Sequence, residues 1–411
     1  MKKEVEFEVV IVGSDINAYY MARNFHEEYG VKSHWIGKVK MPATNLSSIG
    51  TAEYVEDLWD KEVFKNTLIN YAKQREGKKL ILIGTNDFYV RNIIENKDEL
   101  EKYYLFNCIS EELFNNLALK DVFYTKYETY DIDFPNTYIF NCGTEKELDE
   151  NKLKSLMFPI IVKPGHNVNY YKHDFPGQAK VYKLNTKEEV VETVDKIKNA
   201  GYTDNLIIQE YIPGDDSMLF DAVIYCNKDS KAQFITFAQI GLQEHTPTGI
   251  GNCTVLVNGY NQFGNTKNIV NRLKRFAEKI GYKGPGEFDL KYDERDKKFK
   301  VLEINPRQGR SSYYPTACGF NIAKYLVDDL IYNKNKKFKY IDTEVALSFV
   351  PMHVIKKYVK NKELKNKVLT LKRQKKLINP LVYKKDMNFA RKKWLFKRDV
   401  NYCRKYKKYS W

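Results

Sequence analysis

The chain has 411 residues, of which 43% are hydrophobic and 29% charged, and its formal net charge at pH 7 is +15. This length exceeds one ordinary hydrophobic core, so we expect two or three packed subdomains. No stretch approaches the roughly 18 apolar residues of a membrane-spanning helix, and a start with Lys2, Lys3, Glu4 and Glu6 is unlike a signal peptide. Six scattered cysteines without a CxxC pair argue against a disulfide framework or a zinc site. We therefore expect a soluble or peripheral protein with reduced thiols, in the cytoplasm.

The positive charge is concentrated near the C-terminus. Residues 334–411 carry 25 Lys+Arg and 5 Asp+Glu, whereas the remainder carries 43 Lys+Arg and 48 Asp+Glu. Basic runs there alternate with aromatic residues, as in RKKWLFKR at 391–398. Such a segment suits an anionic membrane surface, a nucleic acid or a pyrophosphate-bearing substrate. The alternative is a lysine-rich, solvated subdomain without a partner.

The first part of the chain alternates predicted strands and helices. In order, we expect a strand at 7–12, the turn Gly13-Ser14-Asp15, a helix at 17–29, a strand at 79–83 and the turn Gly84-Thr85-Asn86-Asp87. This alternation predicts a parallel open sheet with ligands at the carboxyl ends of its strands. The first turn lacks GxGxxG, which disfavours a dinucleotide site. We expect this domain to end near residue 118.

Short strands and helices follow, and the strands lengthen after residue 219. We expect strands at 137–140, 158–162, 179–184, 206–212, 219–226, 234–240 and 253–257, and helices at 187–200 and 267–280.

A β-hairpin is predicted by GEFDLKYD (286–293), a polar turn and FKVLEINPR (299–307). A turn centred near Asp296 sets Asp289 opposite Glu303, and strand alternation places Asn305 on the same face as Glu303. Two opposed carboxylates repel each other, and a bound divalent cation removes that cost. An all-oxygen ligand set suits Mg²⁺ that bridges phosphates. The alternative is a solvated outer face on which these charges align by chance.

The string FDLKYD…KVLEINPRQGRSS resembles the metal-binding hairpin of the ATP-grasp superfamily, as found in its carboxylate–amine ligases. In that family two acids and an asparagine hold Mg²⁺ on the phosphates of ATP, which implies Asp289, Glu303 and Asn305 as metal ligands. The resemblance also implies that Arg307 and Arg310 contact the transferred phosphoryl group or the substrate carboxylate. Guanidinium suits this role because it binds oxyanions bidentately and stays charged.

Two lysines match the points at which ATP-grasp ligases place phosphate-binding lysines. Lys163 ends the apolar run FPIIV, and Lys120 follows Leu117-Ala-Leu. A lysine at such a position is otherwise an ordinary surface residue. The polar stretch between Gly165 and Ala179 resembles a loop that closes over the phosphates, although it is richer in histidine and aromatic residues than in many relatives.

The string QEYIPGDD, residues 209–216, resembles the hinge between the two gripping subdomains of the same family. The resemblance implies that Glu210 and the backbone of Tyr211 and Ile212 contact adenine, and that Asp216 contacts ribose. The alternative, a plain strand that ends in a turn, explains Pro213-Gly214 but not the residues that accompany them.

The opening string VIVGSDINAYYMARNFHEEYGVKS is similar to the start of the peptidoglycan D-aspartate ligases. Those enzymes activate the β-carboxylate of D-aspartate as an acyl-phosphate and transfer it to a lysine side-chain amine of a wall-precursor peptide. The resemblance implies that Ser14, Asn17 and the turn Thr85-Asn86-Asp87 line the substrate entrance. Asn17 also fits an ordinary position early in a helix. His245 is a candidate general base, or an ordinary loop histidine.

The resemblance implies a mixed α/β and α+β ATP-grasp fold. Its parts are a Rossmann-like domain at 1–118, an N-terminal ATP-grasp subdomain at 119–212, a C-terminal subdomain with the metal hairpin at 213–335 and a basic extension at 336–411.

The implied cofactors are ATP and Mg²⁺. The implied partners are D-aspartate, an amine acceptor on a cell-wall precursor, and an anionic membrane or polyanionic precursor at the inner membrane face. Alternatives are a ligase for another amino-acid or peptide pair, a bicarbonate-activating carboxylase, and a polyanion-binding protein.

Overall fold

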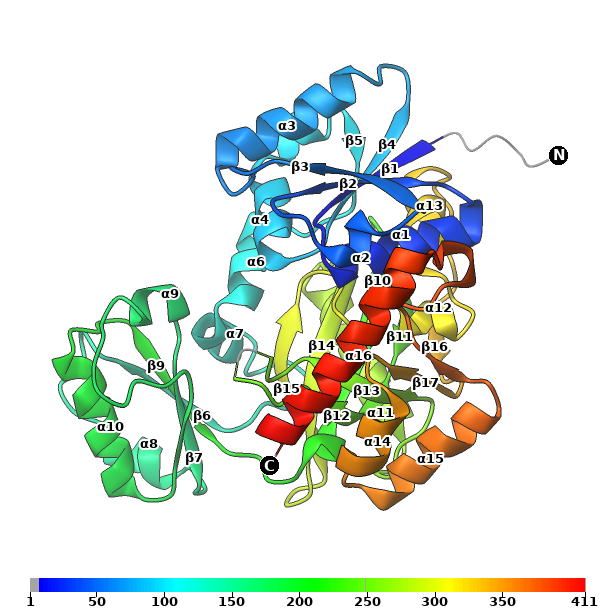
Figure 1. Ribbon diagram of the computed structural model, residues 1–411. Helices are drawn as coiled ribbons and strands as arrows, with labels where there is room; N and C mark the ends of the chain where they lie inside the picture. Colours follow the sequence, from blue (N-terminus) through cyan, green and yellow to red (C-terminus); the bar gives the residue numbers. More distant parts are fainter. Residues whose placement is uncertain (1–6, 248, 411) are drawn as a thin grey trace. The chain divides into compact units, whose positions relative to one another are not determined.

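The computed structural model describes residues 7–247 and 249–410, so the charged residues at 2–6 lie outside it (Figure 1). The chain forms two compact units. Unit 1 comprises Met1–Phe114, Asp215–Asp289 and Asn305–Trp411, and unit 2 comprises Asn115–Gly214 and Leu290–Ile304.

The N-terminal part of unit 1 is a five-stranded parallel sheet, as predicted, with the order β3-β2-β1-β4-β5. Its strands are β1 Phe7–Val12, β2 Ser33–Gly37, β3 Gly50–Tyr54, β4 Lys79–Gly84 and β5 Tyr104–Leu105. Helix α1, Ile16–Tyr29, begins where the Asp15 carboxylate accepts hydrogen bonds from two backbone N–H groups, and ends at Gly30 with φ 71°. The other helices are α2 Pro42–Asn45, α3 Lys61–Lys73, α4 Asp87–Glu95, α5 Lys97–Leu100 and α6 Glu111–Ala118.

The large sheet is mainly antiparallel and runs β15-β14-β10-β12-β13-β17-β18, with β11 pairing to β10 and β16. Its strands are β10 Leu219–Cys226, β11 Ala232–Thr236, β12 Ala238–Gln243, β13 Cys253–Asn258, β14 Gly284–Asp293, β15 Lys298–Asn305, β16 Lys339–Ile341, β17 Val345–Ser348 and β18 Leu377–Ile378. The associated helices are η1 Asp216–Met218, α11 Thr266–Lys279, α12 Tyr314–Ala317, α13 Ile322–Leu330, α14 Met352–Tyr358, α15 Lys362–Arg373, η2 Lys384–Asp386 and α16 Phe389–Tyr409.

The single strand predicted at 234–240 is wrong, because the structure has two strands, β11 and β12, that meet at Phe237. Both pair with β10 in one antiparallel register, but a side chain interrupts the ladder between them. The Thr236 hydroxyl accepts a hydrogen bond from the Val223 N–H at 3.0 Å and lies 3.1 Å from the Val223 carbonyl. It also donates to the Tyr314 hydroxyl at 2.6 Å, a contact 78 residues away in sequence.

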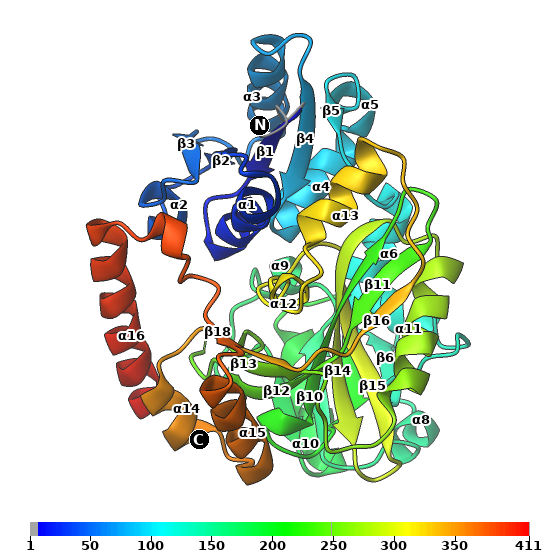
Figure 2. The same cartoon turned by 90° about the vertical axis from the view of Figure 1, so that its right-hand side faces the viewer.

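The basic C-terminal segment is built into unit 1. Strands β16, β17 and β18 complete the large sheet, and Figure 2 shows α16 beside α14. Two buried side chains anchor α16: the Arg391 guanidinium donates to the Ala43 carbonyl at 2.8 Å, and the Tyr406 hydroxyl donates to the Gln243 carbonyl at 2.7 Å. None of the described helices is both long enough and apolar enough to span a bilayer.

Unit 2 contains a four-stranded antiparallel sheet with the order β6-β9-β7-β8. Its strands are β6 Thr137–Asn141, β7 Ile160–Pro164, β8 Tyr182–Leu184 and β9 Asn205–Glu210, and its helices are α7 Lys120–Lys126, α8 Glu150–Lys154, α9 Asn167–Tyr170 and α10 Lys187–Asn199. Strand β8 is shorter than the strand predicted at 179–184. Val190, Val194 and Ile197 of α10 pack on this sheet in the core of the unit.

Candidate active site

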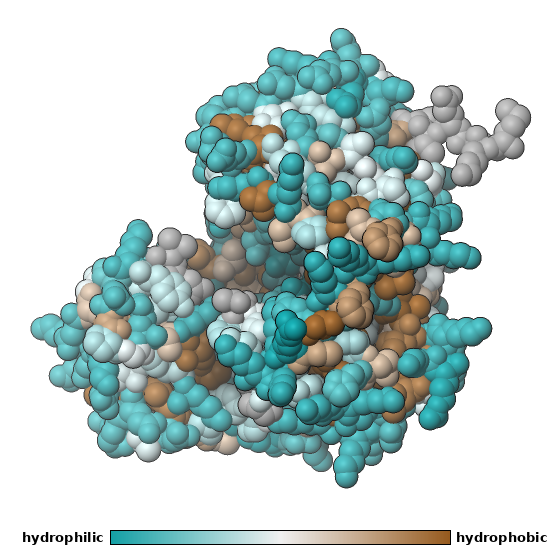
Figure 3. Space-filling view, viewed as in Figure 1, coloured by the Kyte–Doolittle hydropathy of each residue, from teal (hydrophilic) through white to brown (hydrophobic). Residues whose placement is uncertain are grey.

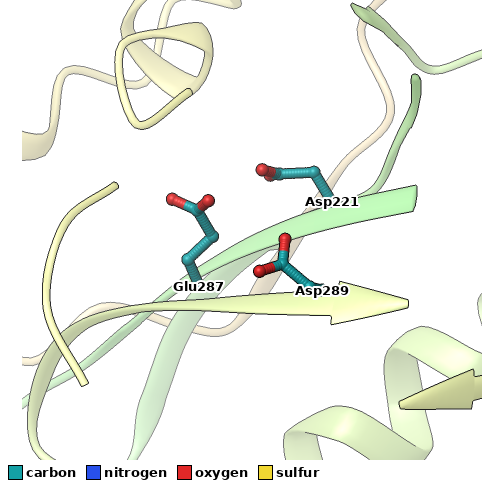
Figure 4. A group of neighbouring side chains, drawn as sticks. All are labelled: Asp221, Glu287 and Asp289. Atoms are coloured by element: carbon teal, nitrogen blue, oxygen red, sulfur yellow. The ribbon is translucent and has the colours of Figure 1, made fainter. Parts of the chain in front are cut away.

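Three carboxyl groups of unit 1 lie close together on neighbouring strands of the large sheet. Asp221 lies on β10, while Glu287 and Asp289 lie two residues apart on β14. One oxygen of each group lies within 4.8 Å of the others, and Figure 4 shows the three groups converging. Asp221 is 1% exposed and Glu287 7%. Buried like charges at this separation repel strongly, so the cluster requires a cation or retained protons.

Hydroxyl and amide groups orient two of these carboxyl groups. Ser311 and Tyr314 donate their hydroxyl hydrogens to Asp221 at 2.6 and 2.8 Å. The Asn305 side chain, at the end of β15, donates to Asp289 Oδ2 at 3.0 Å. The side chains of Asp289 and Asn305, two of the three predicted metal ligands, therefore meet, and their role at a metal stays a prediction.

Glu287 is the most constrained of the three acids. Within the described residues, its Oε2 atom makes no hydrogen bond. A Cβ atom added to Gly309 would lie 1.6 Å from that oxygen, so the loop approaches the carboxyl group only because residue 309 has no side chain. Burial and the neighbouring Asp221 raise the pKa of Glu287 well above its usual range. Burial and then the Asp289 charge raise the pKa of Asp221 to about 7.

This donor set fits a hard divalent cation such as Mg²⁺, because every donor is an oxygen and one buried carboxylate oxygen has no hydrogen-bond partner in the described part of the chain. The sequence analysis missed Asp221 and Glu287. Glu287 was detectable from its two-residue spacing from Asp289, which places both on one face of a strand. Asp221 was detectable as the one charged residue in the apolar run LFDAVIYC. The predicted opposition of Asp289 and Glu303 stays a prediction.

The two predicted arginines are held by carboxylates of unit 1. Arg307 Nε donates to Asp87 Oδ1 at 2.9 Å, and Arg307 Nη2 donates to Asn305 Oδ1 at 3.2 Å. Arg310 Nη1 lies 3.4 Å from Glu244 Oε2. Arg307 is thus linked through Asn305 to Asp289, which places a fixed cation beside the carboxyl cluster.

Polar residues follow β1 and β4, whose ends pair at Val12 and Gly84. The Ser14 hydroxyl donates to the Val39 carbonyl at 2.8 Å. The Asn17 side chain donates to the Thr85 carbonyl at 3.4 Å, in the first turn of α1.

The turn after β4 is largely structural. The Thr85 hydroxyl donates to the Val12 carbonyl at 2.9 Å and is fully buried. The Asn86 side chain caps α4 by accepting from the Tyr89 N–H at 2.9 Å. Of the predicted turn residues, Asp87 alone has a side chain that contacts one of the predicted arginines.

Unit 2 brings both predicted phosphate lysines toward one carboxylate. Lys120 begins α7, and its Nζ lies 2.5 Å from Glu303 Oε2. Lys163, on β7, donates to Gln209 Oε1 at 3.1 Å and lies 5.5 Å from the centre of the Tyr124 ring. Burial and then the charge of Lys120 lower the pKa of Lys163 to about 7. Glu303 therefore belongs to the lysine pair of this unit.

The predicted adenine acid is engaged by unit 2 itself. Glu210 ends β9 and is buried. Its Oε1 accepts hydrogen bonds from the Asn136 side chain at 3.1 Å and the Met157 N–H at 2.8 Å. Arg295 Nη2 lies 3.6 Å from Oε2.

The remaining hinge residues fall on both sides of the division between the units. Tyr211 and Ile212 belong to unit 2, whereas Asp216 belongs to unit 1. Asp216 accepts two hydrogen bonds from Gln243, at 3.0 and 2.7 Å, and its Oδ2 lies 2.9 Å from His245 Nε2. Burial alone raises the pKa of Asp216, but the contacts with His245 and Gln243 outweigh burial and leave it below its usual value. The predicted ribose ligand and the candidate base thus pair with each other.

Solved structures with this architecture define the class of the fold. An L-amino acid ligase from Bacillus licheniformis matches with a TM-score of 0.55 and 12% identity, covering 80% of this chain and 75% of that one. An N5-carboxyaminoimidazole synthetase from Staphylococcus aureus, solved with ADP, matches with a TM-score of 0.61 and 11% identity over 84% and 82% of the chains. The biotin carboxylase domain of a Hydrogenobacter thermophilus 2-oxoglutarate carboxylase, solved with MgADP, ADP and bicarbonate, matches with a TM-score of 0.59 and 14% identity over 83% and 73%. The fold is the ATP-grasp fold.

A sequence relative narrows the class. The D-aspartate ligase of Enterococcus faecium is 32% identical over 405 residues, covering 95% of this chain and 93% of the relative. The chain belongs to the D-aspartate ligase family, although no family model matches it. It is an ATP-dependent carboxylate–amine ligase that forms ADP and acts on amino-acid and amine substrates.

The lowered pKa of Lys163 predicts a pH-dependent stability. Between pH 7 and the ordinary lysine pKa of about 10.4, the unfolded chain binds a proton at this site that the folded chain does not. Stability therefore rises with pH in this window. From pH 7 to pH 9, the free energy of unfolding of the wild type should rise by about 2 kcal/mol relative to Lys163→Met.

Urea titrations of the full chain at pH 7, 8 and 9 measure this difference. The control is Lys183→Met, which removes an exposed lysine from the adjacent strand β8. Parallel pH profiles for the wild type and Lys163→Met would contradict the lowered pKa.

Proposed function

We propose that the chain joins the β-carboxylate of D-aspartate to the lysine side-chain amine of a peptidoglycan precursor. The observation that carries this proposal is the 32% identity to a D-aspartate ligase along 95% of the chain. In the proposed reaction, a substrate carboxylate oxygen attacks the γ-phosphorus of ATP and ADP leaves. The amine then attacks the acyl carbon of the acyl-phosphate, phosphate leaves with the bonding electron pair, and the amine loses a proton.

In this proposal Asp289, Glu303 and Asn305 hold Mg²⁺, with Asp221 and Glu287 completing the oxygen set on the unit 1 side. Mg²⁺ supplies charge neutralisation at the phosphates of ATP. The support is the convergence of two buried carboxyl groups with the partly exposed Asp289, together with the Glu287 oxygen that has no hydrogen-bond partner among the described residues.

The other roles follow the chemistry of each side chain. Lys120 and Lys163 bind phosphate oxygens, and Lys163 gains its proton when a bound anion offsets its burial and the charge of Lys120. Arg307 and Arg310 bind the oxyanions of the transferred group and the substrate carboxylate. The remaining residues keep the roles that the resemblance implies. Adenine is bound by Glu210, Tyr211 and Ile212, ribose is bound by Asp216, and the substrate entrance is lined by Ser14, Asn17, Thr85, Asn86 and Asp87.

We further propose that the outer face of α16 contacts an anionic membrane. Two aromatic side chains on this helix are unusually exposed, Phe389 at 81% and Phe396 at 71%. The lysines at 392, 393 and 397 are also exposed and lie on the same helix. Figure 3, viewed as Figure 1, shows apolar and hydrophilic patches mixed over the area of α16. An aromatic and basic helix face suits the interface of a negatively charged leaflet.

The activation half-reaction is measured with Mg-ATP, hydroxylamine as the trapping amine, and D-aspartate, L-aspartate or D-alanine. Hydroxamate and ADP should form with D-aspartate, and a lysine-containing wall-precursor peptide should gain the mass of one aspartyl residue. Asp289→Asn should lower kcat by about 100-fold or more, because electrostatic stabilisation dominates such transfers. Asp296→Asn, at the exposed turn of the same hairpin, is the matched control and should retain activity.

Turnover with another amino acid alone would overturn the D-aspartate assignment and keep the ligase. Equal activity of the two hairpin variants would contradict the metal assignment.

The membrane proposal is tested by charge reversal, since truncation of α16 would remove the buried Arg391 and Tyr406. Replacing lysines 392, 393 and 397 by glutamate should weaken binding to phosphatidylglycerol vesicles by about 100-fold, at about 1 kcal/mol for each basic residue. The control reverses Lys267, Arg275 and Lys279 on α11, with the same change in net charge. Equal loss of binding in both triple variants would show a general charge effect and refute a specific α16 contact.

A further inference from the structure

Several polar groups of unit 1 converge on Glu244, directly after β12. Lys405 Nζ lies 2.8 Å from Glu244 Oε1, and Arg310 Nη1 lies 3.4 Å from Oε2. The hydroxyls of Thr246 and Tyr402 donate to the same carboxylate at 2.9 and 3.3 Å. Burial alone raises the pKa of Glu244, but the contacts with Lys405 and Thr246 outweigh burial and leave it below its usual value. The carboxylate is therefore charged and fully engaged.

A third cation adjoins this group. Arg398, on α16, lies 4.6 Å from the centre of the Tyr402 ring, and its guanidinium donates to the Phe349 carbonyl at 2.5 Å. Arg310 and Lys405 thus share the Glu244 carboxylate, and Arg398 lies beside the Tyr402 side chain that donates to it.

Two further acids interact electrostatically with these cations: Asp399, which follows Arg398 on α16, and Asp15 on the N-terminal side of α1. Asp15 faces Arg310 and Arg307, but its carboxylate caps α1 by accepting from two backbone N–H groups. Arg307 in turn is paired with Asp87. Glu244 therefore balances only one of the two charges of Arg310 and Lys405, and a partly buried cation is costly unless an anion joins it.

A buried hydroxyl also indicates that an anion binds among these groups. Tyr20, on α1, is 0% exposed, and its hydroxyl has no hydrogen-bond partner within the described residues. Burial raises the pKa of Tyr20, and the charges of Arg398 and Arg310 oppose that rise, which places these cations close to the ring. A buried donor without an acceptor costs about 1–3 kcal/mol. An anion among these groups would accept from Tyr20 and balance the cations at once.

We propose that Lys405 and Arg398 of α16, with the Tyr20 hydroxyl and Arg310, bind the carboxylate of a dicarboxylic amino-acid substrate that is not activated. This inference rests on the proposed function and assigns a specificity role to the C-terminal helix. A monocarboxylic amino acid would leave the cations and the Tyr20 donor unpaired, so the site rejects it through the same groups that bind aspartate.

Two variants test this site without removing the residues assigned to the reacting phosphoryl group. In Lys405→Met, Glu244 retains Arg310, and Tyr20→Phe removes only a hydroxyl. Each should raise the KM for D-aspartate by about tenfold, since a hydrogen bond to a charged group contributes about 1.5–3 kcal/mol. The kcat and the KM for ATP should stay within about twofold of the wild-type values. Each variant loses an interaction that is equally strong in the bound substrate and in the transition state. The preference for D-aspartate over D-alanine should fall by the same factor as the KM rises.

The control is Lys408→Met, an exposed lysine of the same helix, and thermal melting verifies that each variant is folded. Hydroxamate formation by the wild type distinguishes a failure of this inference from a failure of the proposed function. If the wild type uses D-aspartate and both variants keep its KM, the inference is wrong and the proposed function stands. If the wild type activates only D-alanine or another monocarboxylic amino acid, both are wrong.

Discussion

Three carboxyl groups share one small buried volume between β10 and β14, and this crowding constrains the rest of the site. Strand alternation fixes Glu287 and Asp289 on one face, and the neighbouring strand supplies Asp221. Hydroxyls and one amide orient the oxygens, while Gly309 allows the loop to approach Glu287. Such an arrangement is unfavourable while all three groups are charged, and it becomes favourable when a cation binds or when protons are retained.

The division of the chain into units separates the chemical tasks. Unit 1 contains the carboxyl cluster and the arginines, and unit 2 contains Lys120, Lys163 and Glu303. The boundary falls immediately after Asp289 and immediately before Asn305, so the hairpin of β14 and β15 belongs to both units. Glu303 and Asn305 are two residues apart, yet one is paired with a lysine of unit 2 and the other with an acid of unit 1.

Local signals predicted much of the fold. Hydrophobic periodicity, helix caps and turns within the elements themselves predicted the strands at 7–12 and 79–83, the helix that ends at Gly30 and the hairpin after residue 284. Features that depend on distant residues were not found. The break between β11 and β12 depends on the contact of Thr236 with Tyr314, and the short strands β16 to β18 form only because β11, β13 and β17 offer free edges. Asp221 stood out locally as a charged residue in an apolar run, but its role in the cluster depends on partners on β14 that lie more than 60 residues later in sequence.

The central claim is that a substrate carboxylate is activated by ATP. The most direct measurement uses D-aspartate labelled with ¹⁸O in its carboxyl groups, Mg-ATP and an amine acceptor, with mass analysis of the released phosphate. Activation through an acyl-phosphate predicts one ¹⁸O atom in each phosphate, because the substrate oxygen that attacks phosphorus leaves with it. Release of ADP with unlabelled phosphate, in step with product formation, would contradict the account.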